Sequence, residues 1–212
     1  MAGVGYWGSV LISVTIISGT IATIIFALRL YCRHVGSAGL KREDFLMGAG
    51  LLFSYGLVAC TLISVFNGVG HNIEHLPEET RRRVTLVFWL GQKFWILSQI
   101  LVKLSILELI RKLFITVRRL QITITTLLYF TLVWGVGALV GDIFLCLPPQ
   151  YFWIKTIDGI CMQSHAILLI FGSLSVLEDI LILLTPLVEV WRMRMPLRQK
   201  AQIMLLLSLG CL

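Results

Sequence analysis

Residues 93–114 read KFWILSQILVKLSILELIRKLF, and this stretch decides the fold class. Most of its side chains are apolar enough for the hydrocarbon interior of a membrane. Yet Lys103 lies near its centre, Lys93 begins it and Glu108 follows. A lysine at mid-depth costs roughly 3 kcal/mol on insertion scales, so it requires a partner or a polar cavity. The stretch therefore predicts a membrane helix whose polar side faces other helices.

The composition of the whole chain points the same way. Its 212 residues are 58% hydrophobic and 14% charged, whereas a soluble domain usually carries about 25% charged residues. A helix needs roughly 20 apolar residues to cross about 30 Å of hydrocarbon. We therefore predict an all-α, polytopic transmembrane helix bundle that forms one domain over residues 1–212. Its five full spans lie at about 8–31, 44–66, 84–113, 120–146 and 165–191, and a partial sixth covers 200–212.

The distribution of basic residues predicts the orientation of the bundle. Lysine and arginine concentrate on the cytosolic side of membrane helices. With the N-terminus outside, four of the 18 basic residues lie in outer loops, two lie within the third span, and twelve lie on inner flanks. These twelve are Arg29, Arg33, Lys41, Arg42, Arg111, Lys112, Arg118, Arg119, Arg192, Arg194, Arg198 and Lys200. We expect an N-out topology, a plasma-membrane location and contacts with membrane lipids.

The same bias accounts for the pI of about 9.4. A nucleic-acid partner would require a basic face on a soluble fold, which this chain does not offer, so we expect none. A cytosolic signalling partner could use the same basic flanks, and that interpretation stays open.

A polar line runs along the third span. Gln92, Gln99 and Lys103 are spaced by seven and four residues, which places them on one face of a helix. Ser98 and Ser105, also seven residues apart, form a second line. Two polar lines on an apolar helix predict neighbours on more than one side. We therefore expect this helix to be central in the bundle.

The fifth span supplies partners for the buried lysine. Asp179 is the first choice for an ion pair with Lys103, and Glu178 is the second. Lys93 and Asp142 lie in the outer half of the membrane and form a second predicted pair. Such pairs either fix helix register alone or act as a switch or as the floor of a polar cavity, and both interpretations stay open.

Two cysteines bracket the predicted outer loop between the fourth and fifth spans. Cys146 and Cys161 are fifteen residues apart, and with the N-terminus outside this loop faces an oxidising compartment. We predict a disulfide between them. The alternative is a pair of unpaired thiols.

The string HNIEH at residues 71–75 matches the H-x-x-E-H pattern of one metalloprotease class. That chemistry needs both histidines on one helical face. Neighbouring glycines and a proline disfavour a continuous helix here. We keep two interpretations: a weak metal site formed by His71, Glu74 and His75, or a polar cap on a helix end.

Several stretches in order resemble the fungal integral membrane proteins of the "rhodopsin domain" group, the Pth-type class of seven-helix receptor-like proteins. These stretches are ALRLYCR (27–33), REDFLMGAG (42–50), SVFNGVGH (64–71), KLSILELIRKLF (103–114), IFLCLPPQYFW (143–153) with Cys161, and EDILILLTPLVEVWRMRMPLRQKAQIMLLLSLG (178–210). The resemblance implies a seven-helix bundle with a GPCR-like, N-out topology, so we expect the sequence to be C-terminally truncated. We expect no cofactor, because a retinal Schiff base would need a lysine in helix seven, and the expected truncation removes that helix.

Together these patterns predict a receptor-like or sensor membrane protein that binds a small or lipophilic ligand and signals to the cytosol. One alternative is a membrane-embedded enzyme or biosynthetic accessory protein that uses Asp179, Glu178 or His71. Another is an inactive fragment of a seven-helix protein. An enzyme is disfavoured because the sequence shows no nucleophile–base set and no strong metal-ligand spacing.

Overall fold

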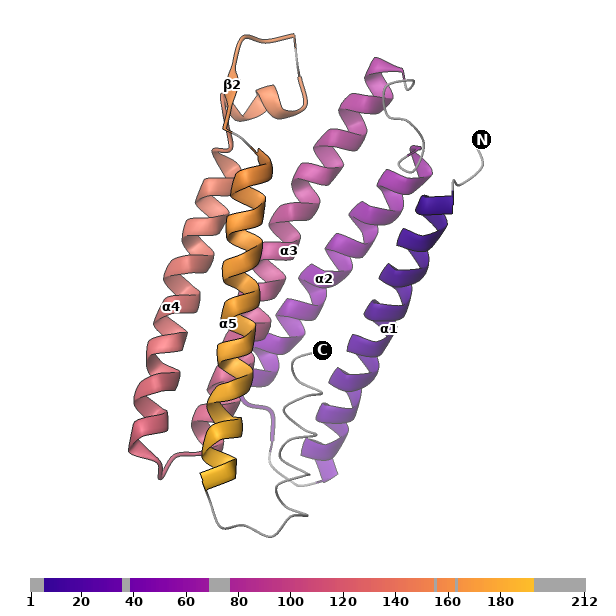
Figure 1. Ribbon diagram of the computed structural model, residues 1–212. Coiled ribbons are helices and arrows are strands. Elements are labelled where there is room, and N and C mark those ends of the chain that lie inside the picture. Colours follow the sequence, from indigo (N-terminus) through magenta and orange to yellow (C-terminus); the bar gives the residue numbers. More distant parts are fainter. Residues whose placement is uncertain (1–5, 36–38, 69–76, 155, 163, 193–212) are drawn as a thin grey trace.

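The computed structural model describes residues 6–35, 39–68, 77–154, 156–162 and 164–192. Most of these residues belong to five long helices (Figure 1), which confirms the predicted all-α class. They are α1 (Tyr6–Val35), α2 (Arg42–Phe66), α3 (Glu78–Leu113), α4 (Arg118–Ile143) and α5 (Ser164–Arg192). Between α4 and α5 lie β1 (Cys146–Leu147), the short 3-10 helix η2 (Pro149–Phe152) and β2 (Ile160–Cys161).

The helix bounds differ from the predicted spans mainly at α3 and α4. Helix α3 begins at Glu78 rather than near residue 84, because Glu78 and Glu79 favour a first turn whose free N–H groups attract negative charge. Helix α4 ends at Ile143, since the chain then enters β1. The predicted partial span 200–212 lies outside the described residues.

Four helices in the described part of the chain are long and apolar enough to cross a membrane. They are α1, α2, α4 and the segment Leu169–Val188 of α5. Helix α3, which carries Lys93, Lys103 and two glutamines, is not among them. The predicted count of five full spans therefore stays a prediction.

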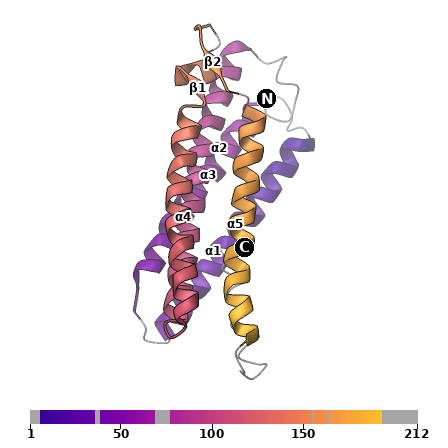
Figure 2. The ribbon, with the colours of Figure 1, turned by 60° about the vertical axis from the view of Figure 1, so that its left-hand side comes forward.

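Helix α3 lies between α2 and α4, in the central place that its two polar lines predict (Figure 1). Helix α1 packs along α2 at one side of the bundle, and α5 packs along α4. Both views place the β1–β2 hairpin and the beginning of α1 at the same end of the bundle (Figure 2). We call this end the hairpin end, and the other the opposite end.

The tightest apolar packing joins α3, α4 and α5. Ile106, Leu107 and Ile110 of α3 pack against Ile124 of α4 and Ile182 of α5, and all five are buried. On the outside, large apolar side chains are exposed along every long helix, as expected for surfaces that face lipid rather than water.

At the opposite end, ion pairs join α1, α2 and α3. Glu43 and Asp44, in the first turn of α2, are almost completely buried. Arg33 of α1 pairs with both, at 2.7 Å from Glu43 Oε1 and 2.8 Å from Asp44 Oδ2. Arg29 lies 3.1 Å from Asp44 Oδ1, and Lys112 of α3 pairs with Glu43. We call these five residues the α2 charge cluster.

Glycine allows the close approach of α3 and α4. A Cβ atom added to Gly135 would lie 2.6 Å from Cδ1 of Ile100 on α3, far inside van der Waals contact. Gly137, two residues later, has no neighbouring atom within 4 Å of such a Cβ. The two glycines therefore differ in packing although they share one helix.

This difference gives a matched pair of substitutions. Gly137→Ala should leave stability unchanged or raise it by up to about 1 kcal/mol, because alanine favours helix. Gly135→Ala should instead lower stability by about 1–3 kcal/mol, because Ile100 must move. Thermal unfolding of both purified variants tests this, and equal shifts for the two would refute the proposed close approach.

Candidate functional site

A cavity of about 460 Å³ lies among α2, α3, α4 and α5, with Leu11 of α1 at its wall. Its volume falls within the usual range for small-molecule sites, roughly 300–1,000 Å³. Most of the lining is apolar or aromatic. Polar and charged side chains reach it from all four helices, and they are Thr61, Ser64, Gln92, Gln99, Lys103, Thr131, Asp142, Ser175 and Glu178.

Lys103 lies at this cavity and is almost completely buried. Its ammonium group donates to the carbonyl oxygen of Ser175 at 3.2 Å and to the Ser175 hydroxyl at 2.9 Å. It also lies 2.9 Å from Glu178 Oε2 and 3.0 Å from Asp179 Oδ1. All these partners belong to α5, so the lysine joins α3 to α5 with charge-assisted hydrogen bonds.

The two carboxylates differ in surroundings. The side chain of Glu178 is 2% exposed and accepts a hydrogen bond from the Thr131 hydroxyl of α4, whereas that of Asp179 is 54% exposed. The structure thus places both predicted partners at the lysine, but the second choice, Glu178, is the buried one. We call Lys103, Thr131, Ser175, Glu178 and Asp179 the inner polar cluster. Its role as a ligand or switch site stays a prediction.

The glutamines of the predicted polar line also border the cavity. Gln92 and Gln99 both line it, together with Lys103. The Gln92 side-chain oxygen is shielded from solvent and has no hydrogen-bond partner among the described residues. The second line faces α2 instead, where Ser98 donates to the Gly50 carbonyl at 2.9 Å and Ser105 donates to the Glu43 carbonyl at 2.6 Å.

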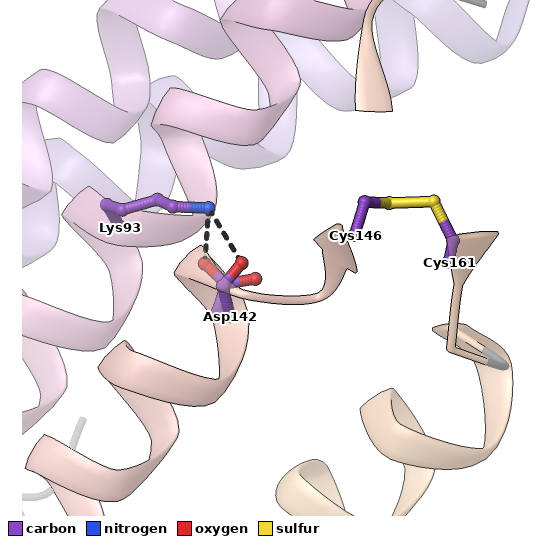
Figure 3. The surroundings of a disulfide bond; sticks show 4 residues. All are labelled: Lys93, Asp142, Cys146 and Cys161. Atoms are coloured by element: carbon purple, nitrogen blue, oxygen red, sulfur yellow. Dashed lines mark hydrogen bonds and ion pairs between the residues drawn. A yellow bond between two sulfur atoms is a disulfide. The ribbon is translucent and has the colours of Figure 1, made fainter. Parts of the chain in front are cut away.

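A second ion pair lies nearer the hairpin end (Figure 3). Lys93 Nζ of α3 is 2.6 Å from Asp142 Oδ2 of α4, and both side chains are largely buried. The ammonium group also lies 3.6 Å from the ring centroid of Trp89, a cation–π contact. Trp89 in turn packs against Trp153 of the loop, with ring centroids 5.2 Å apart. The pair thus connects α3 and α4 beneath the loop of the hairpin end.

The predicted disulfide is present in the hairpin (Figure 3). Cys146 of β1 and Cys161 of β2 are directly opposite each other in the antiparallel pair. The backbone N–H of Met162 continues the pairing by donating to the Leu145 carbonyl at 3.1 Å. The bridge closes the loop that contains η2 and holds it at the end of α4.

The predicted metal site cannot be placed in the bundle. His71, Glu74 and His75 lie outside the described residues. Among the residues that the structure does describe, no group of three or more histidine, cysteine, aspartate or glutamate side chains could hold a metal ion.

The sequence of the chain also identifies its family. Residues 28–212 match the model of the fungal rhodopsin domain. The chain belongs to the fungal rhodopsin domain family. This confirms the resemblance drawn from the ordered sequence stretches and, with the apolar helices, makes the chain a membrane protein.

Two curated relatives of this fungal rhodopsin domain protein are similar over part of their length. A SAT4 family membrane protein of Emericella nidulans is 30% identical over 110 residues, 51% of this chain and 29% of the relative. The polyenoic acids biosynthesis gene cluster protein Ba17b of Metarhizium anisopliae is 25% identical over 194 residues, 88% of this chain and 52% of the relative. The chain thus spans about half or less of these relatives, and no solved structure matches it.

Sequence reasoning missed two members of the inner polar cluster, Thr131 and Ser175. Serine and threonine are common in membrane helices because their hydroxyls satisfy nearby carbonyls of the same helix. Thr131 also contacts the Leu127 carbonyl at 2.9 Å. The sequence alone therefore does not show whether such a hydroxyl also contacts a residue of another helix.

A double-mutant cycle tests the coupling of Lys103 and Glu178. Lys103→Met should lower the free energy of unfolding by about 3–5 kcal/mol, because it leaves a buried carboxylate without its cation. In a Glu178→Gln background the same change should cost at least about 1 kcal/mol less. In a Glu108→Gln background, which removes a partly exposed pair with Arg111, the cost of Lys103→Met should be unchanged. If Lys103→Met costs the same in the Glu178→Gln background as in the Glu108→Gln background, the two residues are not coupled and the pairing is contradicted.

Removing the disulfide should destabilise the hairpin end. Replacement of both Cys146 and Cys161 by serine should lower the free energy of unfolding by about 3 kcal/mol, as expected for opening a fifteen-residue loop. Cys32→Ser is the control, since Cys32 is a free, exposed cysteine. Denaturant unfolding of the purified proteins measures both changes, and equal stability of the double variant and the control would refute a structural role for the bridge.

Proposed function

We propose that this protein is a receptor-like sensor that binds a small lipophilic ligand in the cavity among α2, α3, α4 and α5. The observation that carries the proposal is an apolar cavity with a charged cluster on its wall, which matches the usual composition of small-molecule sites. Membership in the fungal rhodopsin domain family supports a membrane receptor-like protein without naming a ligand.

The position of Lys103 suggests how ligand binding could be transmitted. Lys103 borders the cavity and is held by α5, and nine residues further along α3, Lys112 pairs with Glu43 of the α2 charge cluster. Nine residues of helix span about 14 Å. A rigid shift of α3 on ligand binding would therefore move Lys112 against α2. In this proposal, α3 is the element that couples the cavity to the opposite end.

We also propose that all five helices cross the plasma membrane with the N-terminus outside. Four basic residues at helix ends support this orientation: Arg33 at the end of α1, Arg42 at the start of α2, Lys112 at the end of α3 and Arg118 at the start of α4. All four belong to the opposite end, as the positive-inside rule requires of a cytosolic face. The disulfide lies at the hairpin end, in agreement with an oxidising exterior.

A biosynthetic accessory role is the second candidate function. Its support is the name of one relative, a polyenoic acids biosynthesis gene cluster protein, of which this chain covers 52%. Under this proposal the cavity would hold a biosynthetic intermediate rather than a signal. Product formation by the purified protein in lipid, lost on Glu178→Gln, would favour this role over a sensor.

Filling the cavity tests the ligand-binding proposal. Gly172 lines the cavity and has no neighbouring atom within 4 Å of an added Cβ, so Gly172→Phe can extend into the open space. Gly137→Phe is the matched control, because Gly137 has equal room but does not line the cavity. The probe is Nile red, detected in lipid nanodiscs by energy transfer from the six tryptophans of the chain, of which Trp95 and Trp134 line the cavity.

Gly172→Phe should weaken binding of Nile red by about tenfold or more, which is at least about 1.4 kcal/mol. Gly137→Phe should bind it as the unmodified protein does. Equal binding by the two variants would contradict ligand binding in this cavity.

Thiol labelling tests the orientation. Cys32 is exposed near the end of α1, so an impermeant maleimide should label it only after cells are permeabilised. The experiment uses a Cys60→Ser, Cys211→Ser background to remove competing thiols. A cysteine introduced by Ile157→Cys, in the loop of the hairpin end, should be labelled on intact cells. The reverse pattern would show that the N-terminus is inside.

A further inference from the structure

The charged groups at the cavity wall are paired within the protein. In the described part of the chain, the charged residues that line the cavity are Lys103, Asp142 and Glu178. Glu178 lies 2.9 Å from Lys103, and Asp142 lies 2.6 Å from Lys93. Asp179, a further partner of Lys103, does not line the cavity and is 54% exposed. Each charge at the wall therefore has a counter-ion in the protein, and none is left over for an ionic ligand.

The hydroxyl groups beside the inner ion pair are also engaged. The Thr131 hydroxyl donates to Glu178, and the Ser175 hydroxyl accepts from Lys103 at 2.9 Å. Thr61, on the α2 side of the cavity, donates to a carbonyl of its own helix at 3.0 Å. These groups hold the helices together, so a ligand would have to break existing hydrogen bonds to use them.

The polar side chains of the lining that remain open are neutral. They are Ser64 of α2 and Gln92 and Gln99 of α3, which have no hydrogen-bond partner among the described residues. Of the polar atoms of these three side chains, Gln92 Oε1 alone is shielded from solvent. A hydroxyl both donates and accepts, and a carboxamide has two N–H donors and one carbonyl acceptor. The wall therefore offers a ligand donors as well as acceptors, all without charge.

Gln99 is the open group with the most apolar surroundings. It lies seven residues beyond Gln92 on the same face of α3, which is about 10 Å deeper along the helix. Its neighbours on α3, Trp95, Ile96 and Ile100, line the same cavity. An amide in an apolar site is costly unless a hydrogen-bonding partner replaces water. A ligand that brings such a partner gains the most at Gln99.

We propose that the cavity binds a neutral amphipathic molecule, whose hydroxyl or carboxamide group pairs with Gln99 while its hydrocarbon body lies among the aromatic side chains. Trp95, Trp134 and Phe171 line the space for that body. A hydroxyl or carboxamide can accept from the amide N–H and donate to the amide oxygen. An ionised head group would lose its water and find no free counter-ion, so the cavity excludes it. This inference rests on the proposed ligand binding and specifies the chemical class of the ligand.

Four probes with the same decyl chain test the proposal: the alcohol, the protonated amine, the carboxylate and the alkane, each brominated on the last carbon. Bromine quenches tryptophan fluorescence on contact, and of the six tryptophans Trp95 and Trp134 line the cavity. Measurements use the full chain in nanodiscs of neutral lipid at neutral pH. The quenching of Gly172→Phe gives the contribution of probe dissolved in the bilayer, and each affinity is referred to the amount of probe in the bilayer.

The alcohol should bind about tenfold or more tightly than either ion, because only the ions lose hydration without gaining a counter-ion. Gln99→Leu should weaken binding of the alcohol by about threefold or more, as expected for the loss of a neutral hydrogen bond. The same variant should bind the alkane as the unmodified protein does, which also shows that the cavity is still formed. Gln150→Leu is the matched control: Gln150 is exposed on η2, does not line the cavity, and should leave both affinities unchanged.

Two results would overturn the inference while the cavity still binds lipophilic chains. If the amine or the carboxylate binds as tightly as the alcohol, the cavity does not select a neutral ligand. If Gln99→Leu leaves the alcohol unchanged, or weakens the alcohol and the alkane alike, Gln99 does not hold the polar group. A different failure would reach further: if no probe quenches more in the unmodified protein than in Gly172→Phe, the proposed ligand binding itself fails, and this inference falls with it.

Discussion

The bundle depends on satisfying one buried ammonium group. Lys103 lies in the most central helix, and a lysine in an apolar surrounding is tolerated only where acceptors replace its water. Among the described residues, the acceptors that hold it all come from helix α5: a backbone carbonyl, a hydroxyl and two carboxylates. This requirement fixes the rotation of α5 against α3, and through Thr131 it draws α4 into the same contact.

Two other lysines of α3 pair with carboxylates of neighbouring helices, one on each side of Lys103 along the helix. Toward the hairpin end, Lys93 pairs with Asp142 of α4 beneath the disulfide-closed loop. At the opposite end, Lys112 reaches Glu43 of α2, which also pairs with Arg33 of α1. Three lysines of one helix thus connect it to three different neighbours. Apolar packing and glycine contacts fill the space between, but the ion pairs determine which helix faces which.

Much of this arrangement could be predicted from the sequence. Charged residues inside apolar runs are few, and each must find a partner of opposite charge, so the pairing of α3 with α4 and α5 could be expected before any coordinates. The family could likewise be identified from ordered stretches that span most of the chain, and the match over residues 28–212 agrees.

What the sequence could not predict depends on helix rotation. Glu178 and Asp179 are neighbours separated by about 100° around the helix axis, so only the packing of α5 decides which one is buried. The same holds for Gly135 and Gly137, of which only the first touches α3. Helix α3 also shows the limit of composition, since it is not among the helices that are apolar enough to cross a membrane by length and composition alone, and its polar line lies within it. That line is the feature that borders the cavity.

The central claim is that Lys103 is held by the carboxylates of α5 inside the bundle. Solid-state NMR of the protein in lipid bilayers, with ¹⁵N-lysine and ¹³C-carboxyl labels, measures this contact directly. The account predicts a strong dipolar coupling between Lys103 Nζ and the Glu178 carboxyl carbon, consistent with an Nζ–Oε2 distance of 2.9 Å. The coupling should disappear in Glu178→Gln and persist in Glu108→Gln. An assigned Lys103 signal without coupling to any carboxyl carbon would contradict it.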